Sequence, residues 1–183
     1  MSERTRNDVI PLVRLAEPAE FEALALLESA AGVRFAEIGF DLADTTPVAR
    51  SGRIPAAVFV AGRPPVGFAW VELVDGNAHL EEIAVLPEHG RAGIGRALLE
   101  AAVRWAGEEG FGSLTLVTYR DVPWNGPFYA SCGFEVLARR RWTPGLARIR
   151  RRERRAGLDD LGVRLVMTRP TGGPSGSTTR GGR

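Results

Sequence analysis

Apolar and polar positions along the chain alternate in a way that predicts strands and helices in a mixed order. Apolar runs of strand length occupy residues 9–16, 56–61, 66–74, 79–85, 113–118, 133–139 and 163–167. Helical spacing occupies residues 17–32, 94–110, 123–131 and 144–156, and residues 33–55 predict only a short helix and a loop. Short polar turns after residues 61 and 74 predict three successive antiparallel strands, and the strand–helix–strand unit over 79–118 predicts a parallel pair.

The helix that begins near Ile94 has the clearest pattern in the chain. Its apolar residues follow the spacing of one helix face: Ile94, Ala97, Leu98, Ala101, Ala102 and Trp105. Residues of alternating charge occupy the outer face at four-residue steps: Arg96, Glu100, Arg104 and Glu108. We therefore expect one side of this helix to pack on a sheet and the other to face solvent.

A glycine-rich turn, with Gly90, Gly93 and Gly95, directly precedes this helix. A helix start with free N–H groups and few side chains nearby is a site for anions, phosphate above all. The spacing is not the Gly-x-Gly-x-x-Gly of a dinucleotide site, since Leu98 stands where the last glycine belongs, and the chain has no lysine for a P-loop. Taken alone, the turn is also compatible with an ordinary strand-to-helix connection.

The strand before the turn carries acids on both of its faces. Side-chain alternation puts His79, Glu81, Ile83 and Val85 on one face and Leu80, Glu82 and Ala84 on the other. A buried unpaired carboxylate is costly, so Glu81 and Glu82 are expected at a cleft, beside arginines, or beyond the covered part of the sheet. His79 fits a structural histidine as well as a base.

A second polar cluster lies in residues 124–134, Trp-Asn-Gly-Pro-Phe-Tyr-Ala-Ser-Cys-Gly-Phe. Asn125 and Tyr129 are four residues apart and therefore share a face if this segment is helical. Tyr129 can donate a proton and Asn125 can bond an amide. Core packing and a helix cap are the alternative roles.

Composition sets the broad class of the protein. The 183 residues suit one domain, predicted over 1–169, and the Gly/Ser/Thr/Arg-rich segment 170–183 is expected to be a disordered tail. No apolar run is long enough to span a membrane, the N-terminus lacks the apolar core of a secretion signal, and the single Cys132 fits small core filler. These features predict a cytoplasmic protein, and nothing in the sequence indicates a metal site.

Nine of the chain's arginines gather in residues 139–155, with Glu153 as the only acid there. Such a cluster can bind nucleic acid, and a solvated, partly paired helix face is the favoured alternative. The segment can equally line an acceptor site or a contact in a homodimer. We expect no nucleic-acid function.

Taken together, residues 79–134 resemble the GNAT superfamily of acyl-coenzyme A-dependent N-acetyltransferases. The matching residues are Glu-Ile-Ala-Val-Leu-Pro-Glu at 82–88, Gly-Ile-Gly-Arg-Ala-Leu-Leu at 93–99, Asn125, and Tyr-Ala-Ser-Cys-Gly-Phe at 129–134. The resemblance implies an α+β fold with a mixed, mostly antiparallel sheet of about six or seven strands, splayed near its middle and flanked by helices. One departure is Gly90, where the family usually has Gln or Arg; Arg91 is the neighbouring side chain that can replace it.

The resemblance also implies roles by position. Acetyl-CoA would be the co-substrate, and its pyrophosphate and pantetheine would contact Ile83, Ala84, Val85, Arg91, Ala92, Gly93, Ile94, Gly95, Arg96, Asn125, Phe128 and Tyr129. Tyr129 would protonate the leaving thiolate. Glu81 is the first choice for the base and Glu82 the second. His79, Glu81 and Phe35 would contact the acceptor.

The expected reaction is direct transfer of an acetyl group to a primary amine, with two carboxylates favouring a small cationic acceptor. Two alternatives remain at this stage. One is a coenzyme-binding module with little catalysis, and the other is an N-acetyltransferase of proteins or peptides.

Overall fold

The computed structural model describes residues 10–40 and 47–172. Three expectations therefore fall wholly or partly outside the described residues. They are the first residue of the strand predicted over 9–16, part of the loop within 33–55, and the tail beyond residue 172.

The chain forms two compact units, each assembled from several chain segments. The first contains the described part of Met1–Arg53 together with Val58–Trp70 and Glu82–Glu100, and the second contains Ile54–Ala57, Val71–Glu81 and Ala101–Arg183 as far as it is described. The backbone passes from one unit to the other between residues 53 and 54, at the start of the second strand, within the third and fourth strands, and within the helix after the glycine turn.

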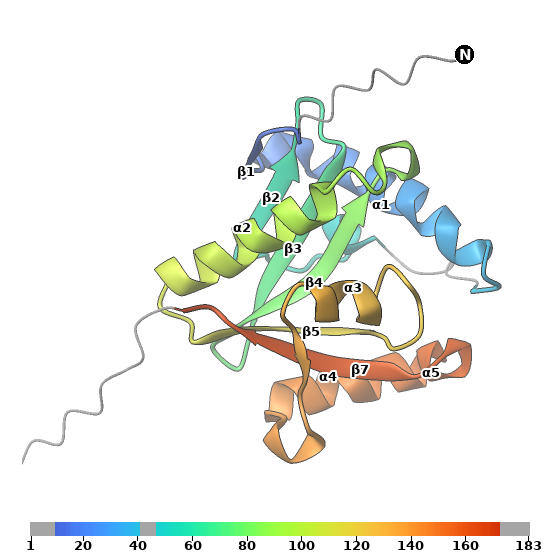
Figure 1. The fold of residues 1–183 in the computed structure, drawn as a ribbon, viewed down its shortest axis with the longest axis vertical. Helices are drawn as coiled ribbons and strands as arrows, with labels where there is room; N and C mark the ends of the chain where they lie inside the picture. Colours follow the sequence, from blue (N-terminus) through green and yellow to red (C-terminus); the bar gives the residue numbers. More distant parts are fainter. Residues whose placement is uncertain (1–9, 41–46, 173–183) are drawn as a thin grey trace, which may run out of the picture. The chain divides into compact units, whose positions relative to one another are not determined.

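The elements follow one another in the mixed order that the sequence predicts (Figure 1). In the first half they are β1 (Val13–Leu15), η1 (Pro18–Glu20), α1 (Phe21–Ala36), η2 (Val48–Arg50), β2 (Ala57–Ala61), β3 (Gly67–Val74), β4 (Asn77–Val85), η3 (Pro87–His89) and α2 (Ile94–Glu108). In the second half they are β5 (Ser113–Tyr119), α3 (Gly126–Ser131), β6 (Glu135–Val136), η4 (Arg139–Arg141), α4 (Pro144–Arg155), α5 (Leu158–Leu161) and β7 (Arg164–Pro170).

The seven strands have the order β1-β2-β3-β4-β5-β7-β6. β4 and β5 are parallel, whereas β1 with β2, β5 with β7, and β6 with β7 are antiparallel. This confirms the expected mixed, mostly antiparallel sheet and the parallel pair. None of the helices in residues 10–40 and 47–172 is both long and apolar enough to cross a bilayer.

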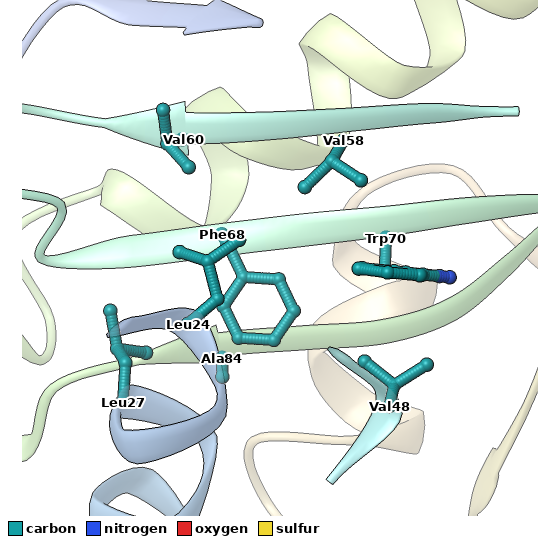
Figure 2. Packing of buried hydrophobic residues seen from close by; sticks show 8 residues of the cluster. All are labelled: Leu24, Leu27, Val48, Val58, Val60, Phe68, Trp70 and Ala84. Atoms are coloured by element: carbon teal, nitrogen blue, oxygen red, sulfur yellow. The ribbon is translucent and has the colours of Figure 1, made fainter. Parts of the chain in front are cut away.

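The core of the first unit lies between its strands and α1 (Figure 2). Alternate residues of β2 and β3 supply half of it, as strand periodicity requires. The buried cluster contains Leu24 and Leu27 of α1, Val48 of η2, Val58 and Val60 of β2, Phe68 and Trp70 of β3, and Ala84 of β4. Trp70 also packs against the Phe21 ring, with centroids 5.3 Å apart.

In the second unit, β5 and β7 run side by side along their whole lengths, from Ser113↔Pro170 to Tyr119↔Arg164 (Figure 1). A smaller apolar cluster of Leu137, Leu146, Ile149 and Val166 joins α4 to β7. Cys132 is buried and free, in agreement with its expected role as core filler.

Several boundaries differ from the predicted ones for local reasons. α1 continues through Gly32 to Ala36, and its last seven residues include the good helix formers Ala30, Ala31, Arg34 and Ala36. β6 has two residues, not seven, because Gly133 adopts a φ of +81° before it and the 3-10 turn η4 follows it. α5 was not predicted; it follows Gly157, which ends α4 in the left-handed region. Pro170 closes β7, and Thr171 N–H donates to Gly112 C=O.

Gly67 allows β3 to lie unusually close to its neighbours in the first unit. A Cβ atom at this position would stand 2.9 Å from the Ala84 carbonyl oxygen, 3.1 Å from Val85 Cγ2 and 3.2 Å from Leu98 Cδ1. Two of the three neighbours belong to β4 and the third to α2. Glycine at this position therefore sets how closely β3, β4 and the start of α2 pack.

We expect Gly67→Ala to lower the free energy of unfolding by about 1–3 kcal/mol, because the added methyl group overpacks a site bounded by backbone. Gly32→Ala is the matched control, since nothing lies within 4 Å of its Cβ position. It should be neutral or stabilising, as Ala is favoured over Gly in a helix. Denaturant unfolding of both variants measures the difference, and equal stabilities would contradict the close packing at Gly67.

Candidate active site

The ladder between β4 and β5 covers only the first part of the two strands. Ala78–Leu80 pair with Leu114–Leu116, while β4 continues to Val85 and β5 to Tyr119. On its other edge, the end of β4 is bonded toward β3, since Leu86 N–H donates to Val66 C=O at 2.9 Å. The Ala84 carbonyl also faces β3, next to Gly67. Because backbone groups alternate along a strand, the N–H and C=O groups of Ile83 and Val85 face the edge opposite β3.

The glycine turn has the form expected of a helix start. Gly93 has a φ of +81° and Arg91 a φ of +62°, so both lie in the left-handed region. Arg91, Ala92, Gly93 and Arg96 are exposed, and Ile94 is buried. Ala97 N–H donates to Gly93 C=O at 3.0 Å, so the N–H groups that precede it stand at the open start of α2. This gives a positively charged, glycine-lined turn at the N-terminus of a 15-residue helix.

Glu82 lies next to this strand edge and turns back on its own backbone. Its Oε1 accepts a hydrogen bond from Ile83 N–H at 3.1 Å. The carboxylate therefore satisfies one of the backbone donors on the edge opposite β3. A ligand that bonded to Ile83 N–H would have to displace it.

In the second unit, Glu81 lies beside the buried ring of His79. His79 is 1% exposed, and its Nδ1 lies 2.9 Å from the Thr115 hydroxyl oxygen on the paired strand β5. The Thr115 hydroxyl donates its hydrogen to Ala78 C=O at 3.2 Å, so His79 Nδ1 must be the donor to Thr115. The other ring nitrogen, Nε2, faces Glu81, and its distance to Glu81 Oε2 is 3.8 Å.

Glu81 also has a cationic neighbour on the arginine-rich helix. Arg152 Nη2 of α4 lies 3.4 Å from Glu81 Oε1. The Glu81 side chain is 18% exposed, so its carboxylate is held between an imidazole and a guanidinium near the surface of this unit. Neither Thr115 nor Arg152 was predicted as a site residue. They are 36 and 71 positions from their partners, and no local sequence pattern marks such contacts.

The Asn125–Tyr129 segment forms the start of α3 in the second unit. Asn125 is its N-cap residue, and Asn125 C=O accepts from Tyr129 N–H at 2.9 Å. The Tyr129 ring is buried and packs edge-on against Phe128 and Phe134, with centroids 5.2 and 5.8 Å away. Gly126 is required here, since a Cβ would stand 2.4 Å from the Arg120 carbonyl oxygen. Core packing and proton donation, the two roles predicted for Tyr129, are both compatible with this position.

The remaining predicted residue, Phe35, lies near the end of α1 in the first unit. Its ring stacks on Phe40 with centroids 6.3 Å apart. His79 and Glu81 belong to the second unit. Within residues 10–40 and 47–172, no group of three or more His, Cys, Asp or Glu side chains is suited to hold a metal ion.

Residues 55–136 match the acetyltransferase (GNAT) domain family. This match supports a GNAT acetyltransferase domain in this part of the chain. The match begins just before β2 and ends with β6, so it includes the glycine turn, Glu81, Glu82, Asn125 and Tyr129.

Solved acetyltransferases share this domain's fold. The ribosomal-protein-S18-alanine N-acetyltransferase of Escherichia coli is 23% identical, with a TM-score of 0.63 over 91% of this chain and 97% of that one. The PaiA N-acetyltransferase of Thermoplasma acidophilum, solved with coenzyme A, is 15% identical, with a TM-score of 0.63 over 87% and 98%. N-acetylglutamate synthase of Neisseria gonorrhoeae, solved with coenzyme A and N-acetyl-glutamate, is 17% identical, with a TM-score of 0.62 over 87% of this chain and 35% of that one.

Asp75, in the turn between β3 and β4, holds the start of α4 in place. It thereby helps to position the helix that carries Arg152. It accepts hydrogen bonds from Gly145 N–H and from the Arg148 guanidinium, the latter at 3.0 Å. A Cβ at Gly145 would stand 2.5 Å from Val74 Cγ1, so only glycine permits this approach. The Thr143 hydroxyl first, and Gly145 N–H second, hold the pKa of the Asp75 carboxyl below its ordinary value.

We expect Asp75→Asn to weaken the docking of α4 in a pH-dependent manner. Because the folded-state pKa of Asp75 lies below its ordinary value of 3.8, the carboxylate stabilises the fold above that pH. This stabilisation is lost as the pH falls through the folded-state pKa. The difference in unfolding free energy between wild type and variant should therefore be full at neutral pH and shrink in acid. Denaturant unfolding across this range measures it, with Asp160→Asn, an exposed acid of α5, as control. A difference that does not change with pH would contradict the assigned role.

Proposed function

We propose that the protein transfers an acetyl group from acetyl-CoA directly to a primary amine, with both substrates bound at once. The family of residues 55–136 supports acyl transfer as the reaction class. Two proteins with the same fold were solved with coenzyme A, which supports the choice of co-substrate. The observation that carries the proposal is the exposed glycine turn at the start of α2, directly after the strand that bears Glu81 and Glu82.

The turn suits the pyrophosphate of the coenzyme. The open N–H groups at the start of a long helix favour a dianionic group, and the exposed Arg91 and Arg96 add positive charge. Arg91 also replaces the polar side chain that the family usually has at the position of Gly90. In this assignment residues 91–96 bind the pyrophosphate through backbone and side chains together.

The edge of β4 suits the pantetheine arm, whose amides can pair with a strand as another strand does. Ile83 and Val85 offer their backbone groups on the edge opposite β3, while Ala84 lies between them with its carbonyl toward β3. Asn125 and Phe128 are assigned to further contacts with the coenzyme. Binding there would require the Glu82 carboxylate to release Ile83 N–H.

Acetyl-CoA supplies an activated thioester, and the acceptor must attack it as a neutral amine. Glu81 is assigned as the base that takes the ammonium proton, and Glu82 is the second choice, since its carboxylate already caps Ile83 N–H. His79 Nε2 beside Glu81 gives the proton a second acceptor. As the new C–N bond forms and the C–S bond breaks, Tyr129 is assigned to donate a proton to the departing sulfur. Most of the rate gain would come from holding the two substrates together.

Gly93→Val should abolish coenzyme binding. A Cβ at Gly93 would stand 3.2 Å from Ile10 Cδ1, and a φ of +81° is strained for valine, so the turn must change shape. The matched control is Gly110→Val at the other end of α2, a glycine of similar φ with nothing within 4 Å. Isothermal titration with coenzyme A compares the two variants. Normal binding by folded Gly93→Val would exclude the turn as the pyrophosphate site.

Tyr129→Phe should lower kcat by about tenfold or more and leave coenzyme binding unchanged, because only a proton donor is removed. Tyr119→Phe is the control, since Tyr119 is the other tyrosine of the chain and is also buried. Steady-state release of free thiol with a panel of amines gives kcat for each variant. An unchanged kcat in Tyr129→Phe would refute the assigned acid. Coenzyme binding without turnover of any amine would favour the binding-module alternative.

A further inference from the structure

Arg152 lies beside Glu81, the acid that is assigned as the base in the proposed function. Its Nη2 lies 3.4 Å from Glu81 Oε1. The Arg152 side chain is 57% exposed, whereas Glu81 is 18% exposed. The pair therefore joins a largely covered carboxylate to a guanidinium that solvent and solutes can reach.

The position of Arg152 is set by the docking of α4 and not by its own ion pair. Leu146 and Ile149 of α4 are buried in the apolar cluster of the second unit. Arg148, one helical turn before Arg152 and on the same face, bonds Asp75. The helix thus carries Arg152 to Glu81 on a backbone that is fixed at both its start and its buried face.

The contact itself is loose in comparison with the other arginine pairs of this helix. Arg150 contacts Glu153 at 2.5 Å and Asp159 at 2.6 Å, and the Arg150 side chain is only 6% exposed. Among the residues that the structure describes, the Arg152 side chain forms a hydrogen bond with Glu81 alone. This bond uses a single N–H group, on Nη2. A pair with such an exposed guanidinium contributes little to stability, and the rest of the planar guanidinium remains open to another anion.

This arrangement presents one negative and one positive group side by side at the proposed reaction centre. A purely cationic acceptor, such as a polyamine, would meet Arg152 as a like charge and would compete with it for Glu81. An acceptor with a carboxylate next to its amine would satisfy both groups: its ammonium faces Glu81 and its carboxylate faces Arg152. The guanidinium fork matches a carboxylate in geometry as well as in charge.

We infer that the acceptor is a zwitterionic amine of the α-amino acid type, with Arg152 as the residue that binds its carboxylate. This inference rests on the proposed function. It narrows the acceptor from cationic amines in general to those that carry an anionic group beside the reacting nitrogen.

The test compares free amino acids with their carboxamides as acceptors of acetyl-CoA, using the full chain. We expect the amino acid to exceed its amide in kcat/KM by about tenfold or more for the preferred side chain, since a charged hydrogen bond is lost in the amide. Arg152→Gln should bring this ratio close to one, mainly through a higher KM for the acid. Arg152→Lys, which keeps the charge and loses the fork, should give an intermediate ratio.

Arg151→Gln is the matched control, because Arg151 is the exposed neighbour on the same helix; its ratio should equal that of the wild type. If amides or polyamines are preferred and Arg152→Gln speeds them further, Arg152 is a competing cation and the inference is wrong, while the proposed function stands. If nothing in the panel is acetylated although acetyl-CoA binds, the proposed function fails and the inference with it.

Discussion

The arrangement of the site residues depends on where β4 stops pairing with β5. The shared ladder ends at Leu80, although both strands continue beyond it. Before that point β4 holds His79 against Thr115, and after it the backbone of Ile83 and Val85 faces the edge opposite β3. Buried backbone groups need partners, and Glu82 supplies one for Ile83 N–H. One strand can therefore carry both the proposed base and a docking edge.

The arginine-rich segment, residues 139–155, forms more structural contacts than its composition suggests. Arg150 is 5% exposed and is paired with Glu153 and Asp159, and Arg164 of β7 also contacts Glu153. Buried charges are tolerated only when they are paired, so this network fixes α4, α5 and β7 to one another. Arg148 and Arg152 use the same helix to reach Asp75 and Glu81. A cluster that looks like a solvated face in sequence thus includes a buried ion network and one residue at the proposed site.

The local sequence pattern was sufficient to predict an element wherever that segment's own periodicity sets its structure. α2 begins at Ile94 as predicted, because its apolar stripe and the glycine turn before it are both local features. β6 shows the opposite case: the predicted strand is reduced to two residues, because Gly133 turns the chain before it and η4 turns the chain after it. Whether an extended segment pairs depends on the partner strand, which its own sequence does not encode.

The sequence by itself determined the order of the strands and of every α-helix except α5, the parallel pair, the glycine turn and the pair of acids on β4, since spacing and residue chemistry define these directly. Only the tertiary structure decided which groups surround each acid. Thr115 fixes the hydrogen of His79 on Nδ1, and Arg152 reaches Glu81 from a helix 71 residues away. Such contacts depend on strand register and helix docking, and these are set by packing between segments that are distant in the chain.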